Sequence, residues 1–342
     1  MDMKKIFLKD ACPTAVGGQA VMEGIMMKSE ENISVALRLP NGEIHIKTEK
    51  QRKRGSIMKM PILRGVLVFI SSLVQGTQIL MYSANIMERY NGPGAIGEGA
   101  EESKFEKWIT EKFGERALWN IIMYLSVIFS IVVSVGIFVV GPTALVNWLK
   151  SYISNSLMLN LIEGILRIIM FVAYIGIISR MQDIKKLFQY HGAEHKCIHC
   201  FENGEELTPD NCQKYYTLHP RCGTSFLMFV MVISLVLFSL LGWPDLVLRV
   251  LSRLLLIPVI AGMSYELLKW AGRSAGLPVK VLSMPGLLLQ KLTTREPDSR
   301  QLEVAIAAME AVLTDNPSYG EGICDERGRI IRENEFISTR SS

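Results

Sequence analysis

Long apolar runs dominate the second half of this sequence and predict helices that cross a membrane. The run 117–149 holds no charged side chain, and the runs 157–179, 224–243 and 246–270 carry only a few. A helix needs about 20 apolar residues to span the hydrocarbon core of a bilayer. The pattern therefore predicts about four membrane-spanning helices.

The earlier apolar run, 65–87, has a different pattern, because one side of the helix that it predicts is polar. Polar residues recur there at spacings of three or four, at Ser72, Gln75, Gln78, Tyr82 and Asn85. Such an amphipathic helix lies on the membrane surface, lines the interior of the bundle or spans. If it is interfacial or re-entrant, the basic regions 47–64, 180–223 and beyond 270 all face the cytoplasm, as the positive-inside rule favours. We prefer four spans with both termini inside; five is the alternative.

A short β element precedes these helices. The segments 33–39 and 44–48 alternate apolar and polar residues around an Asn-Gly pair, which is a strong signal for a hairpin. Two strands are marginal alone, so we expect partner strands from 14–27 or 278–282. His45 is expected to be an exposed strand residue. The predicted fold class is an α-helical integral membrane protein with a small N-terminal β-hairpin or sheet.

The same patterns predict the domain organisation. Asp298 and Gln301 have the spacing of a capping box that opens an amphipathic helix. The expected parts are a cytoplasmic β element (1–59), an amphipathic or re-entrant helix with a charged loop (60–116), the transmembrane bundle (117–270) with a cytoplasmic polar loop (180–223), interfacial and amphipathic helices (271–315) and a disordered polar tail (316–342).

Composition narrows the class further. The chain has 342 residues, 49% of them hydrophobic, and a formal net charge of +4. That charge is too small, and basic-aromatic patterning too weak, to suggest nucleic acid as a partner. Charged residues interrupt the amino terminus before a signal-peptide core forms. The 6 cysteines are therefore expected to be reduced thiols or metal ligands.

The strongest chemical signal lies in the polar loop, where His191, Glu194 and His195 form an H-x-x-E-H pattern. On a helix the two histidines share a face, so both imidazoles can reach one metal ion. A neighbouring glutamate can serve as the general base, as in inverted zincins. The ordinary alternative is a pair of hydrogen-bonded histidines in a helical loop.

The remaining ligands are less determined by spacing. His219 and Cys222 lie beyond the same loop and are the main candidates, with Glu202 and Glu266 behind them. His199 is eight residues from His191, or roughly 12 Å along a helix, so one ion cannot take all three histidines. Imidazole with thiolate suits zinc, whereas imidazoles with carboxylates leave iron or manganese open.

Two other groups of residues have competing interpretations. A structural zinc site could use four cysteines, at Cys197, Cys200, Cys212 and Cys222, although only the first two have the spacing of a zinc knuckle. The second group consists of four of the charged residues in the apolar runs, Glu163, Arg167, Arg249 and Arg253. Charges in lipid are costly unless paired. We interpret them as interhelical ion pairs; a polar entry for a substrate is the alternative.

Several segments together resemble the YqhQ-like family of bacterial membrane proteins, which have no known function and are described as predicted metal-dependent enzymes. The resemblance covers roughly 14–313 and rests on the segments 18–24, 190–196, 219–226, 258–266 and 285–290. It implies a bacterial cytoplasmic membrane protein, and Cys197 and Cys200 lie outside its motifs. It also implies that Glu23, Arg221 and Glu266 support the metal ligands or bind substrate.

The expected function follows from these residues. We expect a membrane-embedded zinc hydrolase that acts on a peptide or lipid-like substrate at the cytoplasmic face, with membrane lipids as its surroundings. His191 and His195 would bind the divalent ion, His219 or Cys222 would complete the ligand set, and Glu194 would act as general base. The alternative is a non-enzymatic transporter, channel or membrane-assembly factor with a structural His/Cys site. The sequence leaves the substrate and the oligomeric state open.

Overall fold

The computed structural model describes residues 6, 14, 16–51, 60, 62–91, 115–242, 244–271, 276–313, 320–324 and 330–333. The chain divides into two compact units. The first contains Met1–Asn91, Tyr174–Ile233 and Pro258–Ser342, and the second contains Gly92–Ala173 and Ser234–Ile257. The predicted loop at 92–114 lies outside the described residues.

The first unit is built on an antiparallel sheet whose strands follow chain order. The strands are β1 (Gly17–Val21), β2 (Gly24–Lys28), β3 (Asn32–Arg38), β4 (Ile44–Lys50), β5 (Gly320–Cys324) and β6 (Ile330–Glu333). The predicted Asn-Gly turn joins β3 to β4, and Gly42 has a φ of 89° there. The hairpin is therefore confirmed. Residues 14–27 supply its partner strands, which was one of the two expectations.

Two other expectations about strands are wrong. Residues 278–282 belong to helix α11 (Leu277–Thr293), because Pro278 stands at its first turn, where a missing N–H costs nothing. The tail is not wholly disordered, since β5 pairs with β4 over His45–Thr48 and β6 pairs with β5. The open edge of β4 offers unpaired main-chain groups, which a tail segment can satisfy.

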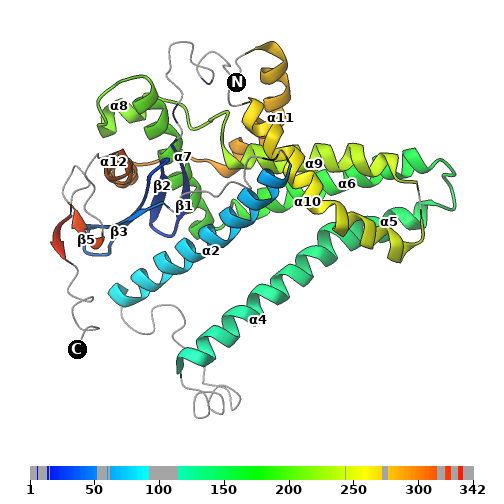
Figure 1. Cartoon of the computed structure of the whole chain (residues 1–342), viewed down its shortest axis with the longest axis horizontal. Coiled ribbons are helices and arrows are strands. Elements are labelled where there is room, and N and C mark those ends of the chain that lie inside the picture. The colour runs from blue at the N-terminus through cyan, green and yellow to red at the C-terminus, as the bar shows by residue number, and fades with distance from the viewer. Residues whose placement is uncertain are drawn as a thin grey trace. The chain divides into compact units, whose positions relative to one another are not determined.

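Helices cover both faces of the sheet (Figure 1). Helices α7 (Gln182–Glu202) and α12 (Ser299–Leu313) pack on the face that carries Ile25, Met27 and Ile46. The second half of α2 (Leu63–Asn91) packs on the opposite face. His45 is therefore fully buried, and its Nε2 lies 2.7 Å from the Tyr82 hydroxyl, so the expectation of an exposed histidine is wrong. From the sequence alone a polar strand residue is expected to be exposed, because the helix that covers its face of the sheet is not known.

The polar side of α2 contacts this sheet. Lys28 donates a hydrogen bond of 2.7 Å to Gln75, and Tyr82 contacts His45 in β4. Two members of the polar stripe thus bind strand residues rather than line a path between spanning helices. This placement accounts for Gln75 and Tyr82, whereas Ser72, Gln78 and Asn85 are exposed.

The predicted capping box is present at the start of α12. The Asp298 carboxylate accepts a hydrogen bond of 2.8 Å from the Gln301 N–H, and the Gln301 side chain accepts one of 2.9 Å from the Asp298 N–H. Each bond satisfies a main-chain donor that the first turn of a helix leaves open. The helix that they begin carries much of the core under the sheet.

Replacing Asp298 by Ala should lower the free energy of unfolding of the first unit by about 1 kcal/mol, because the Gln301 N–H loses its acceptor. Chemical unfolding in detergent measures this change. Ser299→Ala in the same turn is the matched control. Equal stability of the two variants would show that the cap contributes nothing.

The second unit consists of apolar helices. It contains α4 (Glu115–Val135), the π-helical turn η2 (Gly136–Val140), α5 (Gly141–Leu149), most of α6 (Ser156–Ile178) and parts of α9 (Gly223–Leu240) and α10 (Leu246–Ala271). Large apolar side chains on it are exposed, including Phe129 at 69% and Leu255 at 80%. Exposure of this extent needs lipid as the surrounding solvent.

Five helices are long and apolar enough to cross a membrane, by length and composition. They cover Leu63–Tyr90, Leu125–Leu149, Ser156–Ile178, Gly223–Leu240 and Val247–Ala271. The last four correspond to the predicted spans, and the first is the amphipathic helix. The predicted class, a helical multi-pass membrane protein with a small sheet, is confirmed.

Three charged residues of the second unit, Glu163, Arg167 and Arg253, form a cluster of ion pairs. Glu163 forms ion pairs with Arg167, at 2.8 Å, and with Arg253, at 2.7 Å, and it accepts a hydrogen bond from Thr143. Arg167 also donates to the Phe138 carbonyl at 3.0 Å. That carbonyl lacks its usual helical donor, because the residue four positions on is Pro142. The interpretation as interhelical ion pairs is confirmed for Glu163 of α6 with Arg253 of α10, whereas the pair of Glu163 and Arg167 lies within α6. Arg249 instead donates to the Pro244 carbonyl at 2.7 Å.

Candidate metal centre

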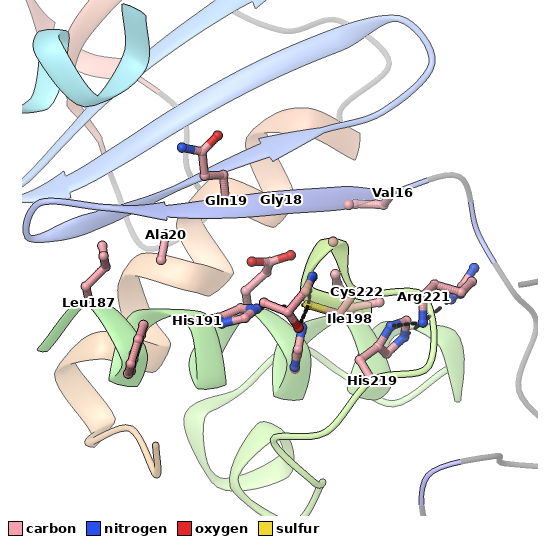
Figure 2. A pocket seen from close by; sticks show the side chains of 16 residues that line it. Val16, Gly18, Gln19, Ala20, Leu187, His191, Ile198, His219, Arg221 and Cys222 are labelled. Atoms are coloured by element: carbon pink, nitrogen blue, oxygen red, sulfur yellow. Dashed lines mark hydrogen bonds between the residues drawn. The ribbon is translucent and has the colours of Figure 1, made fainter. Parts of the chain in front are cut away.

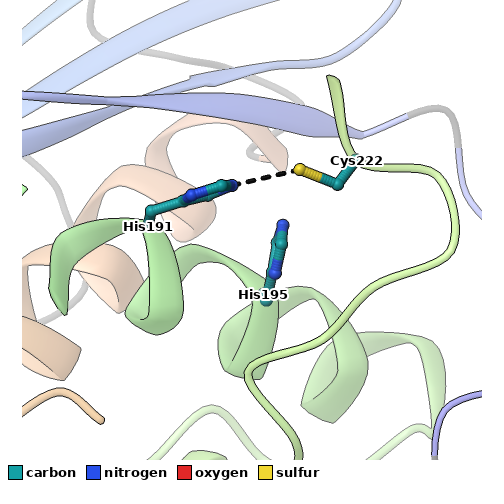
Figure 3. A group of neighbouring side chains, drawn as sticks. All are labelled: His191, His195 and Cys222. Carbon is teal, nitrogen blue, oxygen red and sulfur yellow. Dashed lines mark hydrogen bonds between the residues drawn. The ribbon is translucent and has the colours of Figure 1, made fainter. Parts of the chain in front are cut away.

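Helix α7 presents His191 and His195 on one face, one turn apart, at the edge of the sheet. Their ring centroids lie 4.4 Å from each other. Cys222 immediately precedes α9, and its Sγ lies 3.1 Å from His191 Nε2. One ligand-capable atom from each of the three side chains lies within 4.8 Å of the others, and all three residues are buried (Figure 3). The predicted pair of histidines therefore does converge, with a thiol as the third group.

Main-chain carbonyls fix the direction of both rings. His191 Nδ1 lies 2.8 Å from the Thr293 carbonyl, and His195 Nδ1 lies 2.5 Å from the Thr217 carbonyl. A carbonyl oxygen only accepts, so each Nδ1 carries a proton, and in the neutral tautomer that this selects the lone pair is on Nε2. His195 Nε2 is buried and has no hydrogen-bond partner among the described residues. At metal sites, hydrogen bonds such as those from Nδ1 to the two carbonyls orient the imidazole ligands.

The donor set fits a zinc ion. Zinc takes imidazole nitrogens and thiolate sulfurs as ligands, and catalytic zinc sites have three protein ligands and keep a further position for water or substrate. An unpartnered, buried ring nitrogen costs free energy unless a ligand takes its lone pair. A metal ion at this point would take the lone pair of His195 Nε2, to which no described residue donates a hydrogen bond, and would also contact the Cys222 sulfur.

Glu194 is buried between the histidine pair and strand β1. Its carboxyl accepts a hydrogen bond from the Gly18 N–H. Burial raises the pKa of this carboxyl, while His191 and the Gly18 N–H oppose that change. A Cβ on Gly18 would stand 3.0 Å from the Glu194 carboxyl carbon and 2.5 Å from the Met26 carbonyl oxygen. Gly18 is thus required where strand and glutamate meet.

His219 lines the same cavity, but its nitrogens face other groups. Nδ1 accepts from the Arg221 N–H at 3.3 Å, and Nε2 lies 4.0 Å from Glu202. Arg221 forms an ion pair with Glu202 and donates to the Thr14 carbonyl at 2.7 Å. Burial lowers the pKa of His219. Of the two candidates for the third ligand, the structure brings Cys222 into the group and leaves His219 beside it.

A cavity of about 340 Å³ opens over these residues (Figure 2). Strand β1 forms one wall, α7 forms another, and the segment 219–224 closes the end. Figure 2 shows Ala20 pointing from β1 towards α7, with His191 and Cys222 below the strand. The cavity is large enough for a small chemical group to approach both Glu194 and the histidine pair.

His199 belongs to the packing around the cavity. Its Nε2 lies 3.0 Å from the Leu218 carbonyl, and its ring stacks on Tyr215 at a centroid distance of 6.2 Å. Burial lowers the pKa of His199 to about 4, so the ring is neutral at physiological pH. The expectation that His199 cannot share an ion with His191 and His195 agrees with this placement.

The cysteines do not form the four-cysteine site. Cys222 lies with the histidines, whereas Cys197, Cys200 and Cys212 are fully buried in the core between sheet and helices. The pKa of Cys200 is raised, first by its contact with Cys212 and then by burial. The Cys200 thiol lies 3.5 Å from the Glu206 carbonyl. These three residues are core thiols near one another, and such thiols are inert.

Two residues drawn in by the family resemblance lie away from the cavity. Glu23 follows β1 in a tight turn, with a φ of 51°, and binds Lys186 at 2.8 Å. Glu266 forms two bonds to Arg64, of 3.0 and 2.5 Å, between α10 and α2. Arg221 alone of the three lines the cavity.

Sequence reasoning missed the groups that hold α7 in place. A Cβ on Gly192 would stand 2.0 Å from the Arg295 carbonyl oxygen, so this glycine lets the helix touch the segment after α11. That segment directly follows Thr293, the last residue of α11, whose carbonyl orients His191. Gln290 forms two hydrogen bonds with the His219 main chain, of 2.8 and 2.9 Å. The glycine inside a helical metal motif was the one available signal of close packing.

Comparisons with known proteins agree with the motifs. The model of a family described as "Protein of unknown function (DUF1385)" matches residues 60–315. The chain is 34% identical over 313 residues to the "Uncharacterized protein YqhQ" of Bacillus subtilis (strain 168), with 89% of this chain and 94% of that protein covered. No solved structure matches. Neither description states an activity. The match over most of the chain confirms the resemblance, and the chain belongs to the YqhQ-like DUF1385 family.

Proposed function

We propose that this protein is a membrane-embedded, zinc-dependent hydrolase, with His191, His195 and Cys222 as the metal ligands. The observation that carries the proposal is the buried, unpartnered His195 Nε2, aimed at the place where His191 Nε2 meets the Cys222 sulfur. A hydrogen-bonded histidine pair without a metal would leave that nitrogen's lone pair unsatisfied in the interior, which is costly.

The side chains around this point suit hydrolysis. When bound, a zinc ion supplies Lewis-acid chemistry, which acidifies a water molecule and polarises a carbonyl group. Glu194 takes the proton of the attacking water, whose oxygen bonds to the carbonyl carbon of the substrate. The bond to the leaving nitrogen or oxygen then breaks, and Glu194 returns the proton to that atom. Its bond to the Gly18 N–H holds the carboxyl in position.

The substrate class follows from the surroundings. The cavity includes the start of α9, and an apolar cavity that shares Gln19 and Gly223 with it lies among α2, α9 and α10. The lengths and apolar compositions of these three helices suit a membrane. A substrate that reaches the first cavity is a peptide or lipid-like amphiphile at the membrane surface. The basic regions flanking the spans favour the cytoplasmic face of a bacterial cytoplasmic membrane, with both termini inside.

Metal analysis of purified protein tests the proposal. Wild-type protein should retain zinc through gel filtration, and His195→Ala should bind zinc at least about 100-fold more weakly, because one ligand is lost. His45→Gln, a buried histidine of the sheet, is the matched control and should keep its zinc. Equal, low zinc content in wild type and His195→Ala would end the proposal.

Zinc binding without hydrolysis would indicate a different function. In that case the site would be structural, and the family would comprise transporters, channels or membrane-assembly factors. Incubation of zinc-loaded protein with peptides and with lipid vesicles separates these two functions. Persistent inactivity with bound zinc would favour the structural role.

A further inference from the structure

Strand β1 is the edge of the sheet and forms a wall of the metal cavity. It pairs with β2, and the described part of the chain supplies no strand on its other side. Residues 16–20 line the cavity, and Gly18 within them is exposed. An open edge strand is a template for pairing with another extended chain. A glycine inside a strand often marks a place where another backbone approaches closely.

The register identifies which main-chain groups point outward. Val21 pairs with Gly24 across a two-residue turn, so Val21, Gln19 and Gly17 bond to β2, and the alternate residues Gly18 and Ala20 point away. The bond from the Gly18 N–H to Glu194 agrees with this direction. The Gly18 carbonyl and both main-chain groups of Ala20 thus face the open edge, beside the metal ligands.

A second cavity, of about 430 Å³, adjoins the first. It lies among α2, α9 and α10, and apolar side chains such as Phe69, Leu73 and Phe226 form most of its wall. Gln19 and Gly223 line both cavities. Figure 2 shows Gln19 pointing to the opposite side of β1 from Ala20. The two cavities therefore lie on the two sides of the same open edge.

We propose that the substrate is an extended, apolar peptide segment that adds to the sheet along β1. Its main chain bonds to the N–H and carbonyl of Ala20 and to the Gly18 carbonyl, which brings one peptide bond over the histidine pair. Successive side chains of a strand point to opposite faces, so alternate ones enter the apolar cavity beside α2. The assignment rests on the proposed hydrolase function and names its substrate.

The peptide fits better than a lipid for one reason. An acyl chain would fill the apolar cavity, but it offers no N–H or carbonyl groups at strand spacing to the edge of β1. Strand addition uses both features at once, and it is a common mode of peptide recognition. A segment that is apolar and extended occurs where a membrane protein leaves the bilayer or unwinds.

The test compares two variants at the open edge. Ala20→Pro removes the outward N–H, and an edge strand tolerates proline at such a position; Ala20→Ser keeps the N–H and also changes the side chain. The probe is a pool of synthetic peptides with Leu or Phe at alternate positions, paired with copies that carry Ala there. We expect Ala20→Pro to cleave about tenfold more slowly than Ala20→Ser, the value of one lost hydrogen bond to substrate.

A second variant fills the apolar cavity. Ser72→Phe adds a ring to its wall on α2, and it should reduce cleavage of the Leu and Phe peptides more than cleavage of their Ala copies.

Binding gives a readout independent of turnover. In zinc-loaded Glu194→Gln protein, a peptide that the wild type cleaves should slow amide hydrogen exchange in β1.

The outcomes separate the two proposals. Equal cleavage by Ala20→Pro and Ala20→Ser, at equal zinc content, overturns strand addition and leaves the hydrolase. Hydrolysis of vesicles of phosphatidylethanolamine and phosphatidylglycerol, without cleavage of peptides, does the same and assigns the cavity to acyl chains. Zinc-loaded protein that hydrolyses neither probe overturns both proposals, and so does wild-type protein that binds no zinc.

Discussion

Glu194→Gln should abolish hydrolysis while the metal stays bound. The amide keeps the size of the carboxyl and can still contact Gly18, but it cannot take a proton from water. Loss of a general base typically costs 10²–10⁴-fold, so we expect kcat to fall by at least about 100-fold. The rate is measured with the peptide pool or with lipid vesicles, and the zinc content is measured on the same preparation.

The metal content of this variant distinguishes two roles for the glutamate. Retained zinc with lost turnover identifies a base, whereas lost zinc would make Glu194 a ligand. Glu206→Gln makes the same chemical change at an exposed position on the loop after α7 and controls for it. Turnover by Glu194→Gln at the rate of that control would remove the glutamate from the mechanism.

The sequence predicted the elements better than their contacts. Apolar runs and the capping residues are local signals, and they gave the spanning helices and the start of α12. Residue spacing also placed His191, Glu194 and His195 on one helix face. The choice between His219 and Cys222 depended on carbonyls at Thr217 and Thr293, which no local pattern connects to α7.

Burial on both faces of the sheet was a second non-local property. The sequence of β4 predicts a strand with one solvent-exposed face, because His45, Lys47 and Glu49 alternate with other residues and are polar. The second half of α2 covers that face, and a tail segment about 270 residues further on pairs with its edge. The alternation of residues in β4 indicates neither the helix that covers it nor the strand that pairs with it. The predictions for His45 and for the tail were wrong for this reason.

Charged residues inside the apolar runs were predicted to pair. The geometry of the pairing predicts a large loss of stability when the shared carboxylate is removed. Glu163 is 1% exposed and lies between two guanidinium groups, those of Arg167 and Arg253. Asn160 and Thr143 complete the polar cluster. A carboxylate here balances positive charge that the lipid around these helices cannot solvate.

Glu163→Gln should therefore destabilise the second unit by about 3–5 kcal/mol, because it leaves two buried guanidinium groups without a counter-charge. Thermal unfolding in detergent micelles measures the loss. Met158→Leu, at an exposed position on the same helix, is the control. Adding Arg253→Met to Glu163→Gln removes one of the stranded cations and should restore part of the stability, since an apolar replacement of a buried ion pair costs little. If the double variant were less stable than Glu163→Gln by the full effect of Arg253→Met alone, the two charges would be uncoupled, and the cluster would not be what holds α6 to α10.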